Sequence, residues 1–429
     1  MKKLNIKYSY GFINPRQEGN MPSRSTVDFI IYNGQKIKPN QLLKLESRSK
    51  IDVYFSSFEI DLMDFFDTKK DPKLKKLISI DLSHFYSSKI TNMENFTKFE
   101  LLESINLSNL NASQVTDMHS MFQGCTSLKS VDLQGLLAPS VSDKHSMFYE
   151  CISLESINLT NLNISQVSVI HSIFHGCSSL KSIDLHYLIT SLVTNMYSIF
   201  NGCTSLESIN LSNWDTSNVV NMSEMFSACR SIKYIDLSHF DTSSVTDMNS
   251  MFYKCSSLES INLPNWDTSK VTDMNSMFYK CSSLESINLS RFNTSLVGDM
   301  GSMFYKCNKL KYLSLSNFNT SLNKKIDSMF SECTSLKVLD IPSFNLKNIE
   351  EQNNYRNLFT KVKLKYLNIY DIQNYKDIFD VNLLYNSEKF IVCEKDDIIK
   401  GDNIIKACCH YDTSNDELIP DMPNYIEVK

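Results

Sequence analysis

The chain has 429 residues, of which 42% are hydrophobic and 21% are charged, and its formal net charge is −5. This balance indicates a folded protein rather than a disordered one. The charge shows no dominant basic patch, so we expect no nucleic acid partner, and no apolar run approaches the ~18 residues that a transmembrane helix needs.

The first residues, "MKKLNIKYSYGFINPR", are basic but are not followed by the apolar core of a signal peptide. We therefore predict no signal peptide from this stretch. Residues 1–70 also lack the repeat that fills the middle of the chain. We interpret them as an N-terminal cap that covers one end of the repeat array.

An internal repeat dominates the sequence from about residue 75 onward. Nine of the twelve cysteines follow one another at intervals of 26 residues, and a phenylalanine precedes each by three positions. A constant period over nine copies predicts a stack of identical structural units. These cysteines are Cys125, Cys151, Cys177, Cys203, Cys229, Cys255, Cys281, Cys307 and Cys333.

The first part of each repeat has the spacing of one helix face. In "VTDMNSMFYKC", Met248, Met251 and Phe252 are at positions i, i+3 and i+4. Thr246 or Asp247 stands where a helix N-cap belongs. The pattern predicts a short helix whose methionines and phenylalanine fill the core.

The second and third parts predict a strand and a return loop. "SLESINL" has an LxxLxL pattern that is typical of a short strand, and "PNWDTSKV" is rich in turn residues and carries one large aromatic residue. Helix, strand and loop in 26 residues are typical of leucine-rich repeats. The predicted fold is an α/β leucine-rich-repeat solenoid over residues 71–370, with about twelve turns and a parallel sheet on its concave face. We interpret residues 371–429 as a C-terminal cap.

The repeat resembles that of the BspA-like leucine-rich-repeat surface proteins. Residues 210–263, "NLSNWDTSNVVNMSEMFSACRSIKYIDLSHFDTSSVTDMNSMFYKCSSLESINL", follow the family pattern W-D-T-S-x-V-T-x-M-x-x-M-F-x-x-C-x-x-L-x-x-L-x-L. The resemblance covers about residues 75–370. It implies an adhesin-like, non-enzymatic protein without cofactors, displayed on a cell surface or secreted. The missing signal peptide keeps an alternative open, an intracellular scaffold for protein–protein interaction.

The cysteines invite three interpretations: metal ligands, disulfide partners or buried thiols. Each repeat offers one cysteine without a CxxC partner, which disfavours zinc. We expect buried free thiols that act as small hydrophobic residues. Near the C-terminus, "ACCH" places Cys408 and Cys409 beside His410, and the sequence leaves open whether the two cysteines pair or bind a metal.

The outward positions of the predicted strands form columns. One column alternates in charge through seven repeats, and we expect this alternation to favour correct stacking. It breaks where Glu259 is followed by Glu285, and there we expect a locally weak stack or a bound cation. The alternating residues are Glu103, Lys129, Glu155, Lys181, Glu207, Lys233 and Glu259.

Other columns carry histidines and tyrosines. His119, His145 and His171 recur every 26 residues, and we expect them to face solvent. No Ser/His/Asp arrangement indicates an enzyme. Aromatic side chains are often the strongest contributors to binding, so we predict that Tyr234, Tyr312, Tyr366 and Tyr370 on the concave sheet contact a protein or glycoconjugate partner. The identity of that partner and the oligomeric state are left open.

Overall fold

The computed structural model describes residues 77–81, 93, 99–107, 112–133, 141–159, 168–186, 188–345 and 357–369 with their side chains, and the backbone of strands outside them. The chain divides into two compact units, Met1–Ile232 and Lys233–Lys429. Both units carry the repeat, which forms a parallel β-solenoid in each of them.

The first unit begins with antiparallel strands. These are β1 (Lys2–Tyr8), β2 (Gly11–Ile13), β3 (Val27–Tyr32), β4 (Gln35–Ile37), β5 (Leu43–Leu45) and β6 (Lys50–Phe55). Strand β1 lies between β6 and the first strand of the solenoid, and it pairs antiparallel with both. The amides and carbonyls at that edge of the parallel sheet are therefore bonded instead of open.

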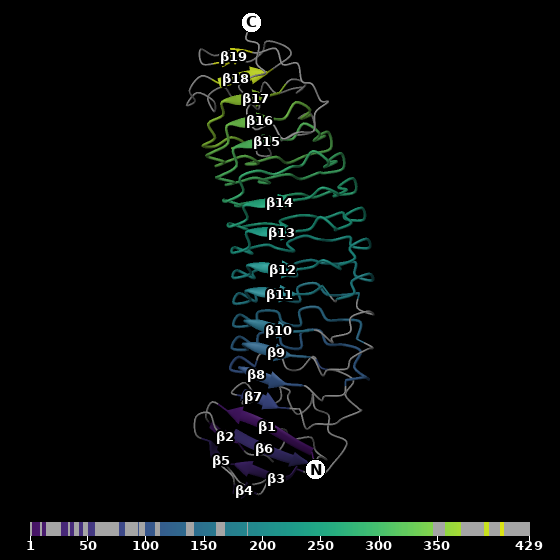
Figure 1. Ribbon diagram of the computed structural model, residues 1–429, viewed down its shortest axis with the longest axis vertical. Helices are drawn as coiled ribbons and strands as arrows, with labels where there is room; N and C mark the ends of the chain where they lie inside the picture. The colour runs from purple at the N-terminus through teal and green to yellow at the C-terminus, as the bar shows by residue number, and fades with distance from the viewer. Residues whose placement is uncertain are drawn as a thin grey trace. The chain divides into compact units, whose positions relative to one another are not determined.

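Parallel strands then follow at one per repeat, five residues long in β7 and three in the others (Figure 1). They are β7 (Leu77–Asp81), β8 (Ser104–Asn106), β9 (Ser130–Asp132), β10 (Ser156–Asn158), β11 (Ser182–Asp184) and β12 (Ser208–Asn210). Strands β7 to β10 pair in sequence, and β11 pairs with β12. The register places Ile105 beside Val131 and Val131 beside Ile157, so the central apolar residue of each strand repeats along the core.

The second unit continues the same pattern. Its strands are β13 (Tyr234–Asp236), β14 (Ser260–Asn262), β15 (Tyr312–Ser314), β16 (Val338–Asp340), β17 (Tyr366–Asn368), β18 (Phe390–Cys393) and β19 (Ile404–Lys406). Strand β13 pairs with β14, and β15 to β19 form one five-stranded parallel sheet. Residues 286–288, which carry the same "SIN" sequence as β14, do not form a strand.

The predicted helix in each repeat is wrong. The described residues contain no helix, and the segment before each cysteine is a series of turns. Two kinds of amide alternate there: Phe252 N donates to Met277 O in the next repeat at 2.9 Å, whereas Tyr253 N donates to Ser250 O at 3.0 Å. Every second amide therefore bonds across repeats, and no i to i−4 helical ladder can form.

Residues in the left-handed backbone region make this path. Ser250 and Lys254 have φ of 53° and 59°, and the same two positions recur through the array. Glycine occupies the second position at Gly176 and Gly202, and a Cβ on Gly202 would lie 3.3 Å from the Cα of Gly176. The predicted cap, Asp247, accepts a bond from Asn249 N at 2.9 Å. It closes an Asx turn, the other structure that such residues favour.

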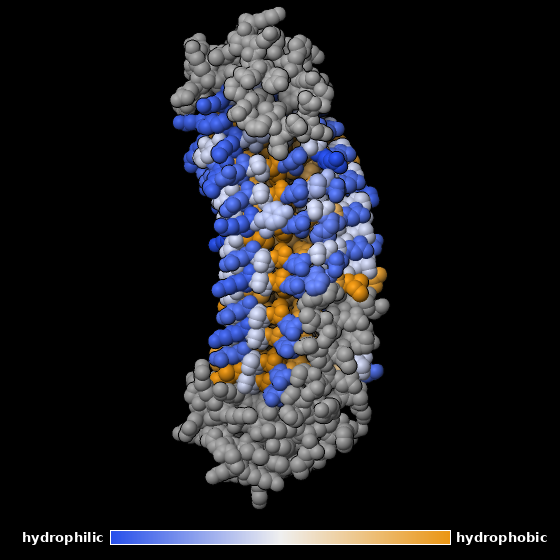
Figure 2. Space-filling view, in the orientation of Figure 1, coloured by the Kyte–Doolittle hydropathy of each residue, from blue (hydrophilic) through white to orange (hydrophobic). Residues whose placement is uncertain are grey.

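The predicted core is confirmed although its helix is not. Met248, Met251, Phe252 and Cys255 are all at most 1% exposed. The aromatic residue of each return loop is buried as well, from Trp214 at 4% to Phe318 at 0%. Figure 2 shows hydrophobic atoms between columns of hydrophilic side chains along the described rungs. The i, i+3, i+4 spacing thus predicts which side chains point inward, because both a helix and this turn conformation bury these three positions.

The predicted number of turns is also wrong. The part of the chain that the structure describes contains about nine regular turns rather than about twelve. The regular spacing of 26 residues fails at both ends, because Ile80 pairs with Ile105 and Leu339 pairs with Leu367. A strand pattern alone therefore overcounts the complete turns.

Candidate functional site

The strand face presents the outward positions of the repeat. In five of the described strands, β8, β9, β11, β13 and β14, the central residue is buried and its two neighbours are exposed. Lys129, Lys181 and Lys233, which directly precede strands, are exposed too, and this confirms the outward placement of the alternating Glu/Lys column. The face is polar and open along each unit, and it offers a regular array of side chains to a partner.

Charge alternation produces little direct pairing on this face. The Nζ of Lys233 lies 3.7 Å from a carboxylate oxygen of Glu259, with both side chains more than half exposed. Such exposed pairs contribute about 0–1 kcal/mol. Glu285, where the alternation breaks, pairs instead with Lys309 at 3.8 Å. The ammonium of Lys309 thus supplies a positive charge beside the two consecutive glutamates.

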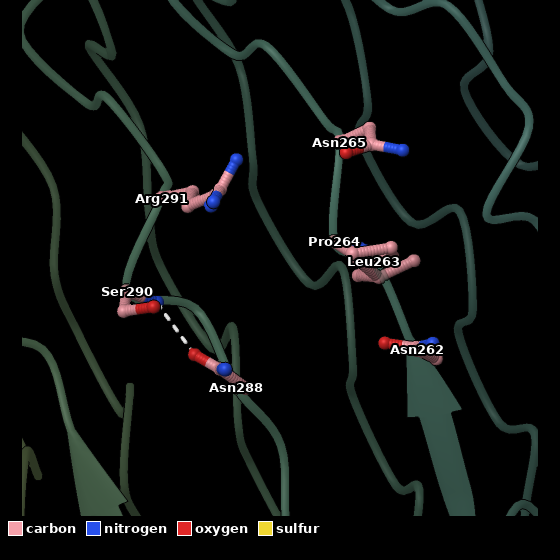
Figure 3. A pocket seen from close by; sticks show the side chains of 7 residues that line it. All are labelled: Asn262, Leu263, Pro264, Asn265, Asn288, Ser290 and Arg291. Carbon is pink, nitrogen blue, oxygen red and sulfur yellow. Dashed lines mark hydrogen bonds between the residues drawn. The ribbon is translucent and has the colours of Figure 1, made fainter. Parts of the chain in front are cut away.

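A polar cavity of about 320 Å³ lies beside this break in the second unit. Figure 3 shows side chains of two consecutive repeats flanking it, just beyond the end of β14. Ser290 N donates to Asn288 Oδ1 at 3.0 Å at its edge. The cavity adds a recess to the strand face where residues 286–288 leave the sheet. Its lining residues are Asn262, Leu263, Pro264, Asn265, Asn288, Ser290 and Arg291.

The predicted partner-binding tyrosines differ in exposure. Tyr234 and Tyr312 are 54% and 38% exposed on β13 and β15. Tyr366 on β17 is 8% exposed, so little of its ring can contact a partner. Tyr370 lies outside the described residues. The structure therefore leaves Tyr234 and Tyr312 as the accessible aromatic residues of the predicted set.

Burial shapes the chemistry around Tyr366. Burial, reinforced by the nearby carboxylate of Asp340, raises the pKa of Tyr366 to about 12. Burial also raises the pKa of Asp340, and bonds from Ser314 Oγ at 2.6 Å and Asn368 Nδ2 at 2.7 Å offset part of this rise. Ser314 and Asn368 satisfy the hydrogen-bonding capacity of the buried Asp340 carboxylate within the sheet, so we assign these side chains a structural role.

The cysteine column is inaccessible. None of the nine described cysteines is in a disulfide bond, and all are 0% exposed. Thiols donate to the backbone of the preceding repeat, as Cys281 Sγ does to Phe252 O at 3.1 Å. Burial raises the pKa of Cys125 and Cys203 to about 12. Because the thiolate is the reactive form, these cysteines are poor nucleophiles and oxidise slowly. Cys408 and Cys409 lie outside the described residues.

The histidine column in the first unit is half-buried rather than fully solvent-facing. The rings of His119, His145 and His171 stack with centroids 5.0 and 4.7 Å apart. Nδ1 of His119 and of His145 lies 2.7 and 2.6 Å from an aspartate two residues earlier. Burial, and then His145, lower the pKa of His171. Among the described residues, no group of three or more His, Cys, Asp or Glu side chains is placed to hold a metal ion.

A second repeated surface was missed by the sequence reasoning. Tyr253, Tyr279 and Tyr305 stack with ring centroids 4.7 Å apart at each step. The lysine that follows each tyrosine lies over its ring, with Nζ at 4.8, 5.2 and 5.3 Å from the centroid. We call these six residues the tyrosine–lysine column. The recurring "FYKC" is the sequence feature that indicates this column. A helical interpretation of that stretch does not place the tyrosine and lysine of one repeat beside those of the next.

The repeat pattern also matches a known family. The family described as "Mycoplasma protein of unknown function, DUF285" matches residues 61–187, 170–286 and 258–369, which together cover more than half of the chain. The chain belongs to this family. It is a repeat family of the BspA type, so the resemblance found in the sequence is confirmed. No match was found among curated proteins.

Solved structures with similar folds are leucine-rich-repeat proteins. One is a leucine rich cell surface protein from Faecalibacterium prausnitzii, 18% identical, covering 63% of this chain and 86% of that one, with a TM-score of 0.28. A leucine-rich repeat protein from Eubacterium ventriosum is 15% identical over 69% and 86%, with a TM-score of 0.31. The functional domain of InlJ from Listeria monocytogenes, which includes a cysteine ladder, is 13% identical over 82% and 76%, with a TM-score of 0.25. Because these identities and TM-scores are low, the assignment of the chain to a repeat family rests on the family match and the repeat geometry.

Proposed function

We propose that this protein is a non-enzymatic, macromolecule-binding solenoid that engages a protein or glycoconjugate partner through its strand face. One observation carries the proposal: Tyr234 and Tyr312 expose 54% and 38% of their surface on that otherwise polar face. Exposed aromatic residues on a rigid scaffold lose little conformational freedom on binding and bury a large area. In contrast, the thiols of the nine described cysteines are buried.

We further propose that the protein acts at a cell surface or in a secreted form, as its BspA-type family implies. A chain with many cysteines outside disulfides would also suit a reducing compartment, which favours the intracellular alternative. Burial weakens that support, because thiols that are 0% exposed survive in an oxidising environment too. The described residues contain no helix able to cross a membrane. Residues 1–70 and 371–429 are proposed to close the ends of the stack.

A binding comparison tests the strand-face site. The full chain and its Tyr234→Ala/Tyr312→Ala variant are assayed on immobilised matrix proteins and on intact microbial cells. Ser260→Ala/Ser286→Ala is the matched control, since these serines are exposed at the same position of neighbouring repeats. We expect the tyrosine variant to lose about tenfold or more in affinity, at 1.4 kcal/mol per tenfold, and the serine variant to bind like the wild type. Equal binding by all three would refute the site.

Protease treatment of intact cells tests the location. The surface proposal predicts that the protein is cleaved before lysis, while a cytosolic marker stays intact. Protection of both proteins until lysis would support the intracellular scaffold instead. The comparison is independent of the tyrosines, so the location and the binding site can fail separately.

A further inference from the structure

The tyrosine–lysine column has no role in the strand-face proposal. It lies in the turns that precede the cysteines, whereas Tyr234 and Tyr312 lie on strands. Backbone bonds hold it in step: Lys254 N donates to Tyr279 O and Lys280 N donates to Tyr305 O, both at 2.6 Å. All six side chains are half-buried. The rings and ammonium groups are therefore ordered before any ligand arrives, which lowers the entropic cost of binding.

The positive charge of this column is only partly neutralised. At its C-terminal end, Lys306 pairs with Glu332 at 3.3 Å, and Tyr305 Oη donates to the same carboxylate at 3.1 Å. In the described part of the chain, Lys254 and Lys280 have no carboxylate within 4.0 Å. Two adjacent cations are thus available in a protein whose net charge is −5.

The backbone makes lysine a costly choice here. Lys254, Lys280 and Lys306 have φ of 59°, 57° and 59°. A left-handed conformation costs a non-glycine residue roughly 1–2 kcal/mol, and glycine takes this position at Gly176 and Gly202. The third copy has changed around it, with Gly301 and Asn308 in place of other residues, yet it keeps the tyrosine and the lysine. Glu150, Ala228 and Glu332 have the same conformation in other repeats, so the left-handed position belongs to the repeat, and three successive copies fill it with lysine.

Geometry selects among anionic ligands. Nucleobases bind by stacking on open aromatic faces, but here the rings cover one another. An extended peptide presents side chains on one side about every 6.7 Å, which falls out of step with rings that repeat every 4.7 Å. A pyranose unit in an extended polysaccharide advances by roughly the length of one rung. In a polysaccharide whose successive acidic groups face the same side, one group per sugar would therefore meet one lysine per repeat.

We propose that the tyrosine–lysine column binds an anionic polysaccharide, with the sulfate or carboxylate of each successive sugar held by the ammonium of one repeat and the tyrosine hydroxyls donating hydrogen bonds beside it. Lys254 and Lys280 are the main contacts. Glu332 competes with the ligand for Lys306 and limits the length of the site. This binding is independent of the strand face.

The test measures affinity of the full chain for four probes: heparin, polygalacturonate, dextran and poly-glutamate. The first two distinguish sulfate from carboxylate as the bound group, and dextran is the uncharged control. We expect Lys254→Gln/Lys280→Gln to weaken binding of heparin or polygalacturonate about tenfold. Lys254→Arg/Lys280→Arg should retain most of the affinity. Lys311→Gln/Lys324→Gln removes the same charge from exposed sites of the same unit and should have little effect.

A gain-of-affinity variant keeps the proposal falsifiable if the lysine changes disturb folding. Glu332→Gln frees Lys306 and should strengthen polysaccharide binding. The proposal is overturned if neither charged polysaccharide binds, or if the control pair weakens binding as much as the column pair. It is also overturned if poly-glutamate binds more tightly than both polysaccharides through the same lysines, because the ligand would then be an acidic peptide.

Discussion

Lys144 occupies a core position that other repeats fill with apolar residues. Met118 and Ile170 hold the same position in the adjacent repeats, and Lys144 is as buried as Met118, at 0% exposed. Burial lowers the pKa of Lys144 from its usual 10.5 to about 7, although Asp143 beside it acts in the opposite direction. We predict that Lys144→Met stabilises the protein, and that the gain depends on pH.

The size of the effect follows from the two pKa values. A pKa difference of one unit corresponds to about 1.36 kcal/mol, so the lysine costs roughly 4 kcal/mol at pH 7 and roughly 2 kcal/mol at pH 9. The sign is that of a lysine whose pKa is lower in the folded state: the unfolded chain binds more protons between pH 7 and 10.5, so wild-type stability rises with pH across this window. Below pH 7 this contribution is constant.

Urea denaturation at pH 7 and pH 9 measures both quantities. We expect Lys144→Met to exceed the wild type by roughly 4 kcal/mol at pH 7, and the difference to shrink by about half at pH 9. Lys181→Met replaces an exposed lysine in the following repeat and should not alter the pH dependence. The reasoning is refuted if Lys144→Met leaves stability at pH 7 unchanged, or if its advantage does not depend on pH.

Three further predictions concern the columns. Phe278→Ala should destabilise the second unit by about 3–5 kcal/mol in urea denaturation, because Phe278 is 0% exposed and stacks 5.5 and 5.7 Å from its neighbours; a loss below 1 kcal/mol would contradict this packing. The nine buried cysteines should react with iodoacetamide only as the protein unfolds, and rapid labelling in the native state would show that they are accessible. Lys181→Glu should change stability by no more than about 0.5 kcal/mol even at low salt, since Lys181 is exposed and has no ion pair within 4.0 Å among the described residues; a large loss would restore the charge alternation as a stabilising device.

The sequence predicted the inward-facing residues better than the backbone that carries them. Met248, Met251 and Phe252 are buried as their spacing required, but a helix and this turn conformation place the same positions inside. The difference lies in the left-handed residues, such as Ser250 and Lys254. Serine and lysine give no sequence signal for positive φ, whereas glycine does, and only three repeats carry glycine at the second position, at Gly124, Gly176 and Gly202.

The candidate sites, too, were predicted only where the strand pattern alone determines which side chains are exposed. A strand pattern was enough to place Tyr234 and Tyr312 on an exposed face, but it did not predict that Tyr366, at the same strand position, is buried. The tyrosine–lysine column depends on bonds between residues about 26 apart, such as that from Lys254 N to Tyr279 O. If the stretch were a helix, its tyrosine and lysine would lie on a solvent-exposed face without being aligned with those of the next repeat.

Every column described above depends on one feature, a helix-free coil whose amides bond from each repeat to the next. Far-UV circular dichroism of the full chain tests this feature most directly. The described repeats contain β-structure and turns, so they are predicted to add no double minimum of an α-helix to the spectrum. A spectrum showing one helix per repeat would contradict the cross-repeat bonding, and with it the placement of both proposed binding surfaces.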